Sequence, residues 1–134
     1  MRHVVRRGEG EHLWLGKGGE QRPIEILVES GTAGTTAFTM GVQNLPPGGQ
    51  VPLHRHPHEE ILFAYSGRAR ITVAGVSHEV GPETAVFIPA DTYHSIENVG
   101  TEEFRMTFTL SPPGYEKVFR EMARGHTEHP SVAP

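Results

Sequence analysis

The chain has 134 residues, enough to bury one hydrophobic core but too few for two full-sized domains, so we expect a single domain over residues 1–134. Twelve basic residues stand against 16 acidic ones, giving a formal net charge of −4. The sequence has no long basic run of the kind that is typical of nucleic-acid-binding proteins. The absence of cysteine excludes disulfides, thiolate metal ligands and a cysteine nucleophile.

The N-terminus lacks an apolar run of signal-peptide length, and no stretch approaches the roughly 20 apolar residues that cross a membrane. We therefore expect a cytoplasmic protein with no membrane or nucleic-acid partner. Lysine occurs only as Lys17 and Lys117, both outside the segments with strand-like patterns. Schiff-base chemistry needs a lysine desolvated in a pocket and is therefore disfavoured.

Residues 1–23 are polar and rich in glycine, and they predict an N-terminal arm with one short strand. The expected core is residues 24–110, where β-branched or alternating segments are separated by Gly and Pro turns. These segments predict strands at 24–29, 35–43, 61–66, 68–73, 76–80, 85–88, 94–98 and 104–110. Because Gly67 directly joins two of them, residues 61–66 and 68–73 predict a hairpin.

The C-terminal segment changes period. Tyr115, Val118, Phe119 and Met122 recur at helical spacing, so we expect a short helix within residues 113–124 that packs as a lid or flank. Residues 125–134 predict a flexible tail. Many short strands followed by one helix predict an all-β jelly-roll barrel with a short C-terminal helix.

Residues 54–60 hold three histidines and two glutamates. His54 and His56 are two residues apart, so in an extended chain both imidazoles point to one face and can share a cation. Glu60 and the distant His94 complete a candidate set of three imidazoles and one carboxylate. Such a set suits one divalent ion of Mn, Fe, Co, Ni, Cu or Zn and leaves coordination positions open. His58 either supports this set or replaces one member.

The strand after the candidate ligands predicts a pocket. If Glu60 begins a regular strand, Leu62 and Ala64 share its face and place apolar side chains above the ion. Other candidates for the pocket walls are Phe38, Met40, Tyr93, Phe104, Met106 and Phe108. Walls of this kind favour a small, flat organic substrate of aromatic or enol type.

The spacing of these residues resembles the first motif of the cupin family. That motif is Gly, five residues, His-x-His, three or four residues, Glu, six residues and Gly. The sequence matches it in full with Gly48, His54, His56, Glu60 and Gly67.

The second cupin motif is matched in part, at Pro89, His94 and Asn98. Glu83 and Asp91 stand at its two glycine positions. Asp91 adopts the left-handed conformation more readily than most residues, and we expect Gly81 and Pro82 to supply the turn beside Glu83.

The chain is therefore similar to small, single-domain, metal-dependent cupins of the quercetinase-like and cyclase groups. The resemblance implies a cupin-type double-stranded β-helix, and a dioxygenase in which Glu60 is both metal ligand and catalytic base. One alternative is a cyclase, isomerase or lyase in which the metal is a Lewis acid. A second is a non-catalytic module that binds a small molecule. Small cupins of this kind also imply a homodimer.

Overall fold

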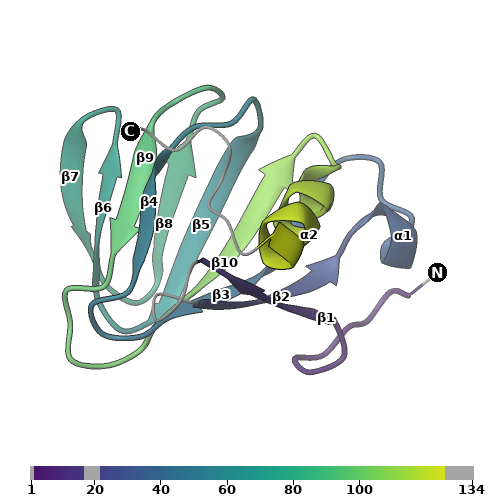
Figure 1. Ribbon diagram of the computed structural model, residues 1–134, viewed down its shortest axis with the longest axis horizontal. Helices are drawn as coiled ribbons and strands as arrows, with labels where there is room; N and C mark the ends of the chain where they lie inside the picture. Colours follow the sequence, from purple (N-terminus) through teal and green to yellow (C-terminus); the bar gives the residue numbers. More distant parts are fainter. Residues whose placement is uncertain (1, 17–21, 126–134) are drawn as a thin grey trace.

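A computed structural model describes residues 2–16 and 22–125 of the protein. The elements in chain order are β1 (Glu11–Leu15), β2 (Arg22–Val28), α1 (Ser30–Ala33), β3 (Thr39–Leu45), β4 (Gln50–His54), β5 (Glu59–Ser66), β6 (Ala69–Val73), β7 (Val76–Val80), β8 (Thr84–Ile88), β9 (His94–Glu97), β10 (Phe104–Ser111) and α2 (Tyr115–Gly125) (Figure 1). The expected flexible tail begins at residue 125, and its residues 126–134 lie outside the described part of the chain.

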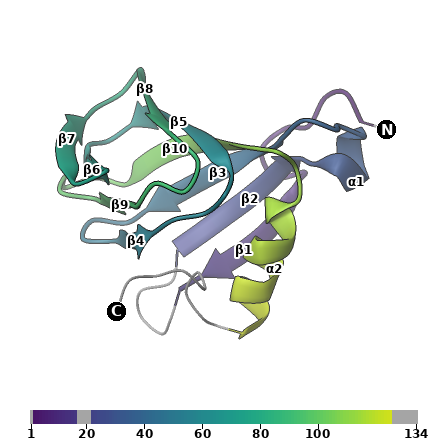
Figure 2. The same cartoon turned by 90° about the horizontal axis from the view of Figure 1, so that it is seen from above.

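The strands form two antiparallel sheets. The larger has the order β1-β2-β3-β10-β5-β8 and the smaller β4-β9-β6-β7 (Figure 2). Both sheets contribute side chains to one hydrophobic core. The expected all-β jelly roll with a short C-terminal helix is confirmed. Neither helix in the described residues has the length and apolar character needed to cross a bilayer.

Strand β10 is the centre of the large sheet. It lies between β3 and β5, and its inward side chains Phe104, Met106, Phe108 and Leu110 are at most 1% exposed. Directly opposed residues share a face of a sheet, so Leu62 of β5, which is paired with Phe108, also points inward. The alternation read from the sequence is thus the inner face of the barrel.

The predicted hairpin of residues 61–66 and 68–73 is wrong. Strand β5 pairs with β10 and β8, whereas β6 pairs with β7 and β9, so the chain crosses from one sheet to the other at Gly67. Gly67 has φ of +85°, and a Cβ at this position would lie 2.5 Å from the carbonyl oxygen of Glu103. Only glycine fits at this position. A single glycine can link the strands of a hairpin or strands of two different sheets, so the sequence alone did not distinguish the two.

The two residues that stand at the glycine positions of the second motif both adopt the left-handed conformation. Glu83 has φ of +63° and Asp91 has φ of +54°. Asp91 behaves as expected, but the turn before β8 is made at Glu83 itself and not by Gly81 and Pro82. The amide of Glu83 donates to the carbonyl of Ala64 at 2.8 Å, which offsets part of the cost of this conformation.

The N-terminal segment covers the outer face of the large sheet. Glu25 of β2 is only 1% exposed there. Its carboxylate accepts hydrogen bonds from the amides of Gly8 and Gly10 at 2.7 and 2.8 Å and from Arg7 Nε at 2.8 Å. Charge-assisted bonds of this kind compensate the burial of the carboxylate and hold the segment against β2.

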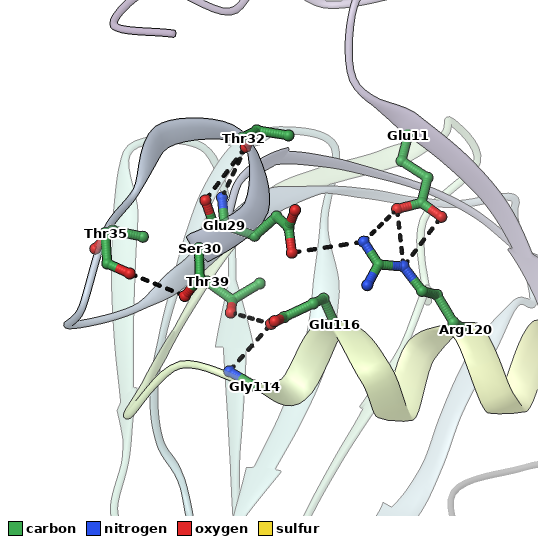
Figure 3. A network of polar contacts seen from close by, with 9 residues as sticks. All are labelled: Glu11, Glu29, Ser30, Thr32, Thr35, Thr39, Gly114, Glu116 and Arg120. Carbon is green, nitrogen blue, oxygen red and sulfur yellow. Dashed lines mark hydrogen bonds and ion pairs between the residues drawn. The ribbon is translucent and has the colours of Figure 1, made fainter. Parts of the chain in front are cut away.

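Helix α2 is attached to the large sheet by polar contacts at two points (Figure 3). Glu116, which is 3% exposed, accepts hydrogen bonds from the hydroxyl of Thr39 at 2.6 Å and from the amide of Gly114 at 3.1 Å. One turn later, Arg120 forms a two-pronged ion pair with Glu11 of β1 and lies 3.5 Å from Glu29. We call Glu116, Arg120 and their partners the α2 anchor.

We predict that Glu116→Gln loosens this anchor. Burial raises the pKa of Glu116, but the hydrogen bonds from Thr39, from its own amide and from Gly114, together with the charge of Arg120, lower it by more, so the net pKa lies below its usual value. The stabilisation is therefore present above the unfolded pKa of about 4.3 and is lost as the pH falls through the lower folded pKa. At pH 7 the substitution should reduce the free energy of unfolding by about 1–2 kcal/mol, measured by denaturant titration.

Glu121→Gln is the matched control on the same helix, because the Glu121 side chain is 72% exposed and pairs only with Arg124 among the described residues. It should change stability by less than about 0.5 kcal/mol. Amide hydrogen exchange should accelerate in α2 of the Glu116 variant alone. Equal effects of the two substitutions would show that the anchor does not hold the helix.

Candidate metal centre

Three histidines at one end of the β4–β9 strand pair converge inside the barrel. His54 ends β4 and is paired with His94, which begins β9, and His56 follows β4 directly. Their exposed fractions are 7%, 1% and 3% respectively. One ring nitrogen of each lies within 4.8 Å of the others, a spacing that allows all three to bind a single ion.

Backbone carbonyls orient the three rings. Nδ1 of His54 lies 2.7 Å from the carbonyl of Pro52, that of His94 lies 2.8 Å from Thr92, and that of His56 lies 3.0 Å from His58. A carbonyl oxygen only accepts, so Nδ1 carries the proton in each ring. In the neutral imidazole Nε2 then has the lone pair, and this is the arrangement found around histidine metal ligands.

Glu60, the second residue of β5, completes the cluster. Its Oε1 lies 3.4 Å from Nε2 of His56 and 3.4 Å from Nε2 of His94. Burial raises the pKa of Glu60, but hydrogen bonds and positive charge from His56 and His94 in their doubly protonated form lower it by more, to about 2. The carboxylate is therefore ionised at neutral pH, as a metal ligand must be.

The cluster fits a divalent cation. Nε2 of His94 is buried and has no hydrogen-bond partner among the described residues, although burying such an atom unsatisfied is costly. Three imidazoles and one carboxylate are a donor set that first-row transition metals accept. A cation at this point would satisfy the orphaned nitrogen and offset the charge of Glu60.

The neighbouring residues Glu59 and His58 have other positions. Glu59 is exposed on the outer face of β5, which agrees with the choice of Glu60. His58 is half-buried and lies outside the cluster of three, but its carbonyl orients His56. The carbonyl of His56 in turn accepts the amide of Asp91 at 2.8 Å. The left-handed turn at Asp91 thus helps to position a candidate ligand.

A cavity of about 30 Å³ adjoins the cluster, with room for one or two water molecules. Helix α2 covers it, because Tyr115, Phe119 and Met122 project from the helix into its wall. The ring of Tyr115 packs edge-to-face on His56, with ring centroids 5.0 Å apart. The remaining lining residues are Leu15, Arg22, Gln43, Val51, Pro52, His54, Glu60, Leu62, His94, Ile96 and Phe108.

Of the wall residues expected from the sequence, Leu62 and Phe108 line this cavity, and Ala64, Phe104 and Met106 are buried in the adjoining core. Phe38, Met40 and Tyr93 do not line it, and Phe38 and Tyr93 are each 40% exposed.

The strand pairing explains why Met40 does not line the cavity. In β3, Gly41 is paired with Phe108 and Gln43 with Met106. Opposed residues share a face, so the odd-numbered residues of β3 point inward and Met40 points outward.

Several polar residues of the cavity were missed. Gln43 lies on a strand from which Phe38 and Met40 were expected to point inward, and Arg22 lies in the segment interpreted as an N-terminal arm. A buried arginine has no signature in a single sequence. Tyr115 was assigned only to the apolar face of the helix. Its helical period, with Phe119 four residues later, could have indicated that the same face covers the barrel mouth.

Fold and cluster together define a class of protein: a small antiparallel β-barrel with a three-histidine, one-glutamate centre under a helical cover. The family model for the cupin domain matches residues 41–110, which include all four candidate ligands, and the chain belongs to the cupin family.

Two relatives are named for polyketide synthesis. The chain is 35% identical over 97 residues to polyketide synthase CurC of Streptomyces cyaneus, covering 72% of this chain and 61% of the relative. It is 27% identical over 119 residues to tetracenomycin polyketide synthase protein TcmJ of Streptomyces glaucescens, covering 88% and 78%. The chain spans only about three fifths of the length of CurC and of several other relatives that it matches.

Among solved structures, polyketide cyclase RemF from Streptomyces resistomycificus superposes with a TM-score of 0.71 and 21% sequence identity, over 83% of this chain and 80% of RemF. At this level of identity the likeness shows a shared fold and no more.

We predict that the cluster binds one divalent ion per chain. His94→Ala should weaken the binding of zinc or nickel by roughly 100-fold or more, because it removes a proposed ligand and not merely a supporting group. His78→Ala is the matched control, since His78 is exposed on β7. Calorimetric titration of metal-stripped protein measures both affinities, and unchanged affinity in the His94 variant would contradict the assignment.

Proposed function

We propose that the protein is a metal-dependent cupin enzyme that cyclises, isomerises or cleaves a small, enolisable organic substrate without redox chemistry. The observation that carries the proposal is the convergence of three oriented imidazoles and Glu60 beside a mainly apolar cavity. The relatives CurC and TcmJ are named for polyketide synthesis, in which enolisable chains are cyclised, and this supports cyclase chemistry over the dioxygenase expected first from the sequence.

In this proposal His54, His56, His94 and Glu60 hold the ion. When bound, a divalent ion supplies Lewis-acid polarisation of a substrate carbonyl oxygen. The Nδ1 hydrogen bonds keep the imidazoles pointed at it, so the site is organised before the substrate arrives.

Glu60 and Tyr115 have complementary proton roles. Glu60 is the one carboxylate lining the cavity in the described part of the chain, so it is the proposed acceptor of a substrate proton. Its lowered pKa makes it a weak base, which suits an acidic enol or phenol better than an unactivated carbon. Burial and the charge of Glu60 raise the pKa of Tyr115, so its hydroxyl keeps its proton and can donate to a substrate oxygen.

Substrate entry requires movement of α2. Pockets for organic ligands usually measure about 300–1,000 Å³, far more than the cavity below the docked helix. We propose that α2 swings away to admit the substrate and then returns, so that Phe119 and Met122 exclude water from the reacting groups.

The reaction can be tested with 3,5-dioxohexanoate, an open-chain acid with two ketones that can cyclise without an oxidant. Zinc-loaded protein under nitrogen should accelerate its cyclisation, followed by chromatography and mass spectrometry. Glu60→Gln should reduce the rate by about 100-fold or more, the usual contribution of a general base. The exposed neighbour Glu59→Gln should retain the wild-type rate.

The alternatives give different results in the same experiment. A dioxygenase would need oxygen and a redox-capable metal, and a non-catalytic module would bind the acid without forming product. Either outcome would overturn the proposed function.

The expected homodimer stays a prediction. Ile61, Phe63 and Phe87 form an apolar strip on the outer face of β5 and β8, and each is at least 40% exposed. A second copy of the chain is the proposed partner of this strip. Light scattering should give the mass of two chains, and Phe63→Asp should give a monomer while Val76→Asp on β7 should not. A wild-type monomer at high concentration would contradict the prediction.

A further inference from the structure

Gln43 places an uncharged polar side chain on the inner face of the large sheet. It is 7% exposed and lines the cavity. Its partners across the sheet are Ile24 of β2 and Met106 of β10, and Met106 is paired in turn with Ala64 of β5. All three of these residues are apolar and buried. The side chains beside Gln43 in the sheet therefore offer its carboxamide no strong hydrogen bond.

The carboxamide of Gln43 forms no hydrogen bond with another residue in the described part of the chain. The other deeply buried amide, that of Asn98, forms three, to the carbonyls of Leu45 and Glu102 and from the backbone amide of Gly100. A buried carboxamide without partners lowers stability, so a structural role does not account for Gln43. Because it faces a cavity, it is available to a water molecule or to a guest that displaces the water.

Gln43 and Glu60 belong to different rows of the large sheet. Glu60 is paired with Leu110 of β10, whereas Gln43 is paired with Met106, four residues earlier on the same strand. At about 3.4 Å per residue, the two rows are about 14 Å apart along the strand direction. Both side chains line the same cavity. A guest held by the candidate metal centre therefore meets Gln43 with a part of its structure remote from the ion.

We propose that Gln43 is a specificity-determining residue, which forms a hydrogen bond with a second oxygen of the substrate, remote from the carbonyl that faces the histidines. A carboxamide donates through its nitrogen and accepts through its oxygen, so it can recognise either a hydroxyl or a ketone. The substrate class is then an organic molecule with an oxygen toward each end and apolar carbon between them. The inference rests on the proposed function in one respect, that this cavity is the substrate site.

Hydroxamates test the inference, because a hydroxamate group binds zinc and leaves the rest of the molecule free to reach Gln43. Zinc-loaded wild-type protein should bind meta- or para-hydroxybenzohydroxamate more tightly than benzohydroxamate, as measured by calorimetry. Gln43→Met, which nearly keeps the shape, should reduce the larger of these preferences by about three- to tenfold, the contribution of one hydrogen bond between neutral groups. The matched control is Gln50→Met, which removes an exposed amide on β4 and should leave the preference unchanged.

Two further measurements separate recognition from a structural role. Gln43→Met should melt no lower than the wild type, because it removes a buried amide that has no partner among the described residues. NMR of isotope-labelled wild type decides the question if the variant does not fold, since the side-chain amide signals of Gln43 should shift more with the hydroxylated ligand than with benzohydroxamate.

Three outcomes would overturn the inference. The first is a wild type that binds the hydroxylated ligands no better than benzohydroxamate, including the case in which none of them binds. The second is a preference that persists in Gln43→Met, whether or not that variant melts lower. The third is a set of Gln43 amide signals that respond equally to both kinds of ligand.

The two proposals fail separately. Binding of the hydroxamates needs no turnover, so a preference that depends on Gln43, without cyclisation of 3,5-dioxohexanoate, would leave the inference standing and reject the proposed function. Zinc-dependent cyclisation with a preference that ignores Gln43 would do the reverse.

Discussion

Three hydrogen bonds from imidazole Nδ1 atoms to backbone carbonyls are the constraint on which the centre depends. Each fixes the tautomer and the direction of one ring, and each carbonyl belongs to a residue two positions away along the chain. The pairing of His54 with His94 then brings the ends of β4 and β9 together, and the turn at Asp91 holds the carbonyl of His56. The geometry of the centre is therefore set by main-chain positions, with the barrel as its frame.

Buried carboxylates solve three separate problems in this small protein. Glu25 fastens the N-terminal segment to the outside of the large sheet, Glu116 fastens α2, and Glu60 faces the histidines. The first two accept short hydrogen bonds from amides, a hydroxyl or an arginine, so their burial is compensated within the protein. Glu60 instead lies against His56 and His94, two of the three clustered imidazoles, and this difference separates a structural carboxylate from a candidate ligand.

The sequence was sufficient to predict most of the strands and the terminal helix, because period-two alternation is a local property, but the strand β4 was not expected. Motif spacing was sufficient to select four candidate ligands that the structure brings close together. It was not sufficient to predict which face of β3 points inward. Met40 and Gln43 lie on opposite faces, and only the pairing of β3 with β10 decides between them. The crossing at Gly67 and the buried Arg22 were missed for a related reason, since both depend on contacts between distant segments.

The small volume of the cavity below α2 links the thermal stability of the protein to the rate at which a guest could exchange. The cavity holds only a water molecule or two, so under the proposed movement of α2, guest exchange and helix docking would share one equilibrium. Each 1.4 kcal/mol added to the α2 anchor would lower the open population about tenfold. Substitutions that raise thermal stability at Glu116 or Arg120 would therefore slow exchange, and stability and speed would be opposing demands on the same few side chains.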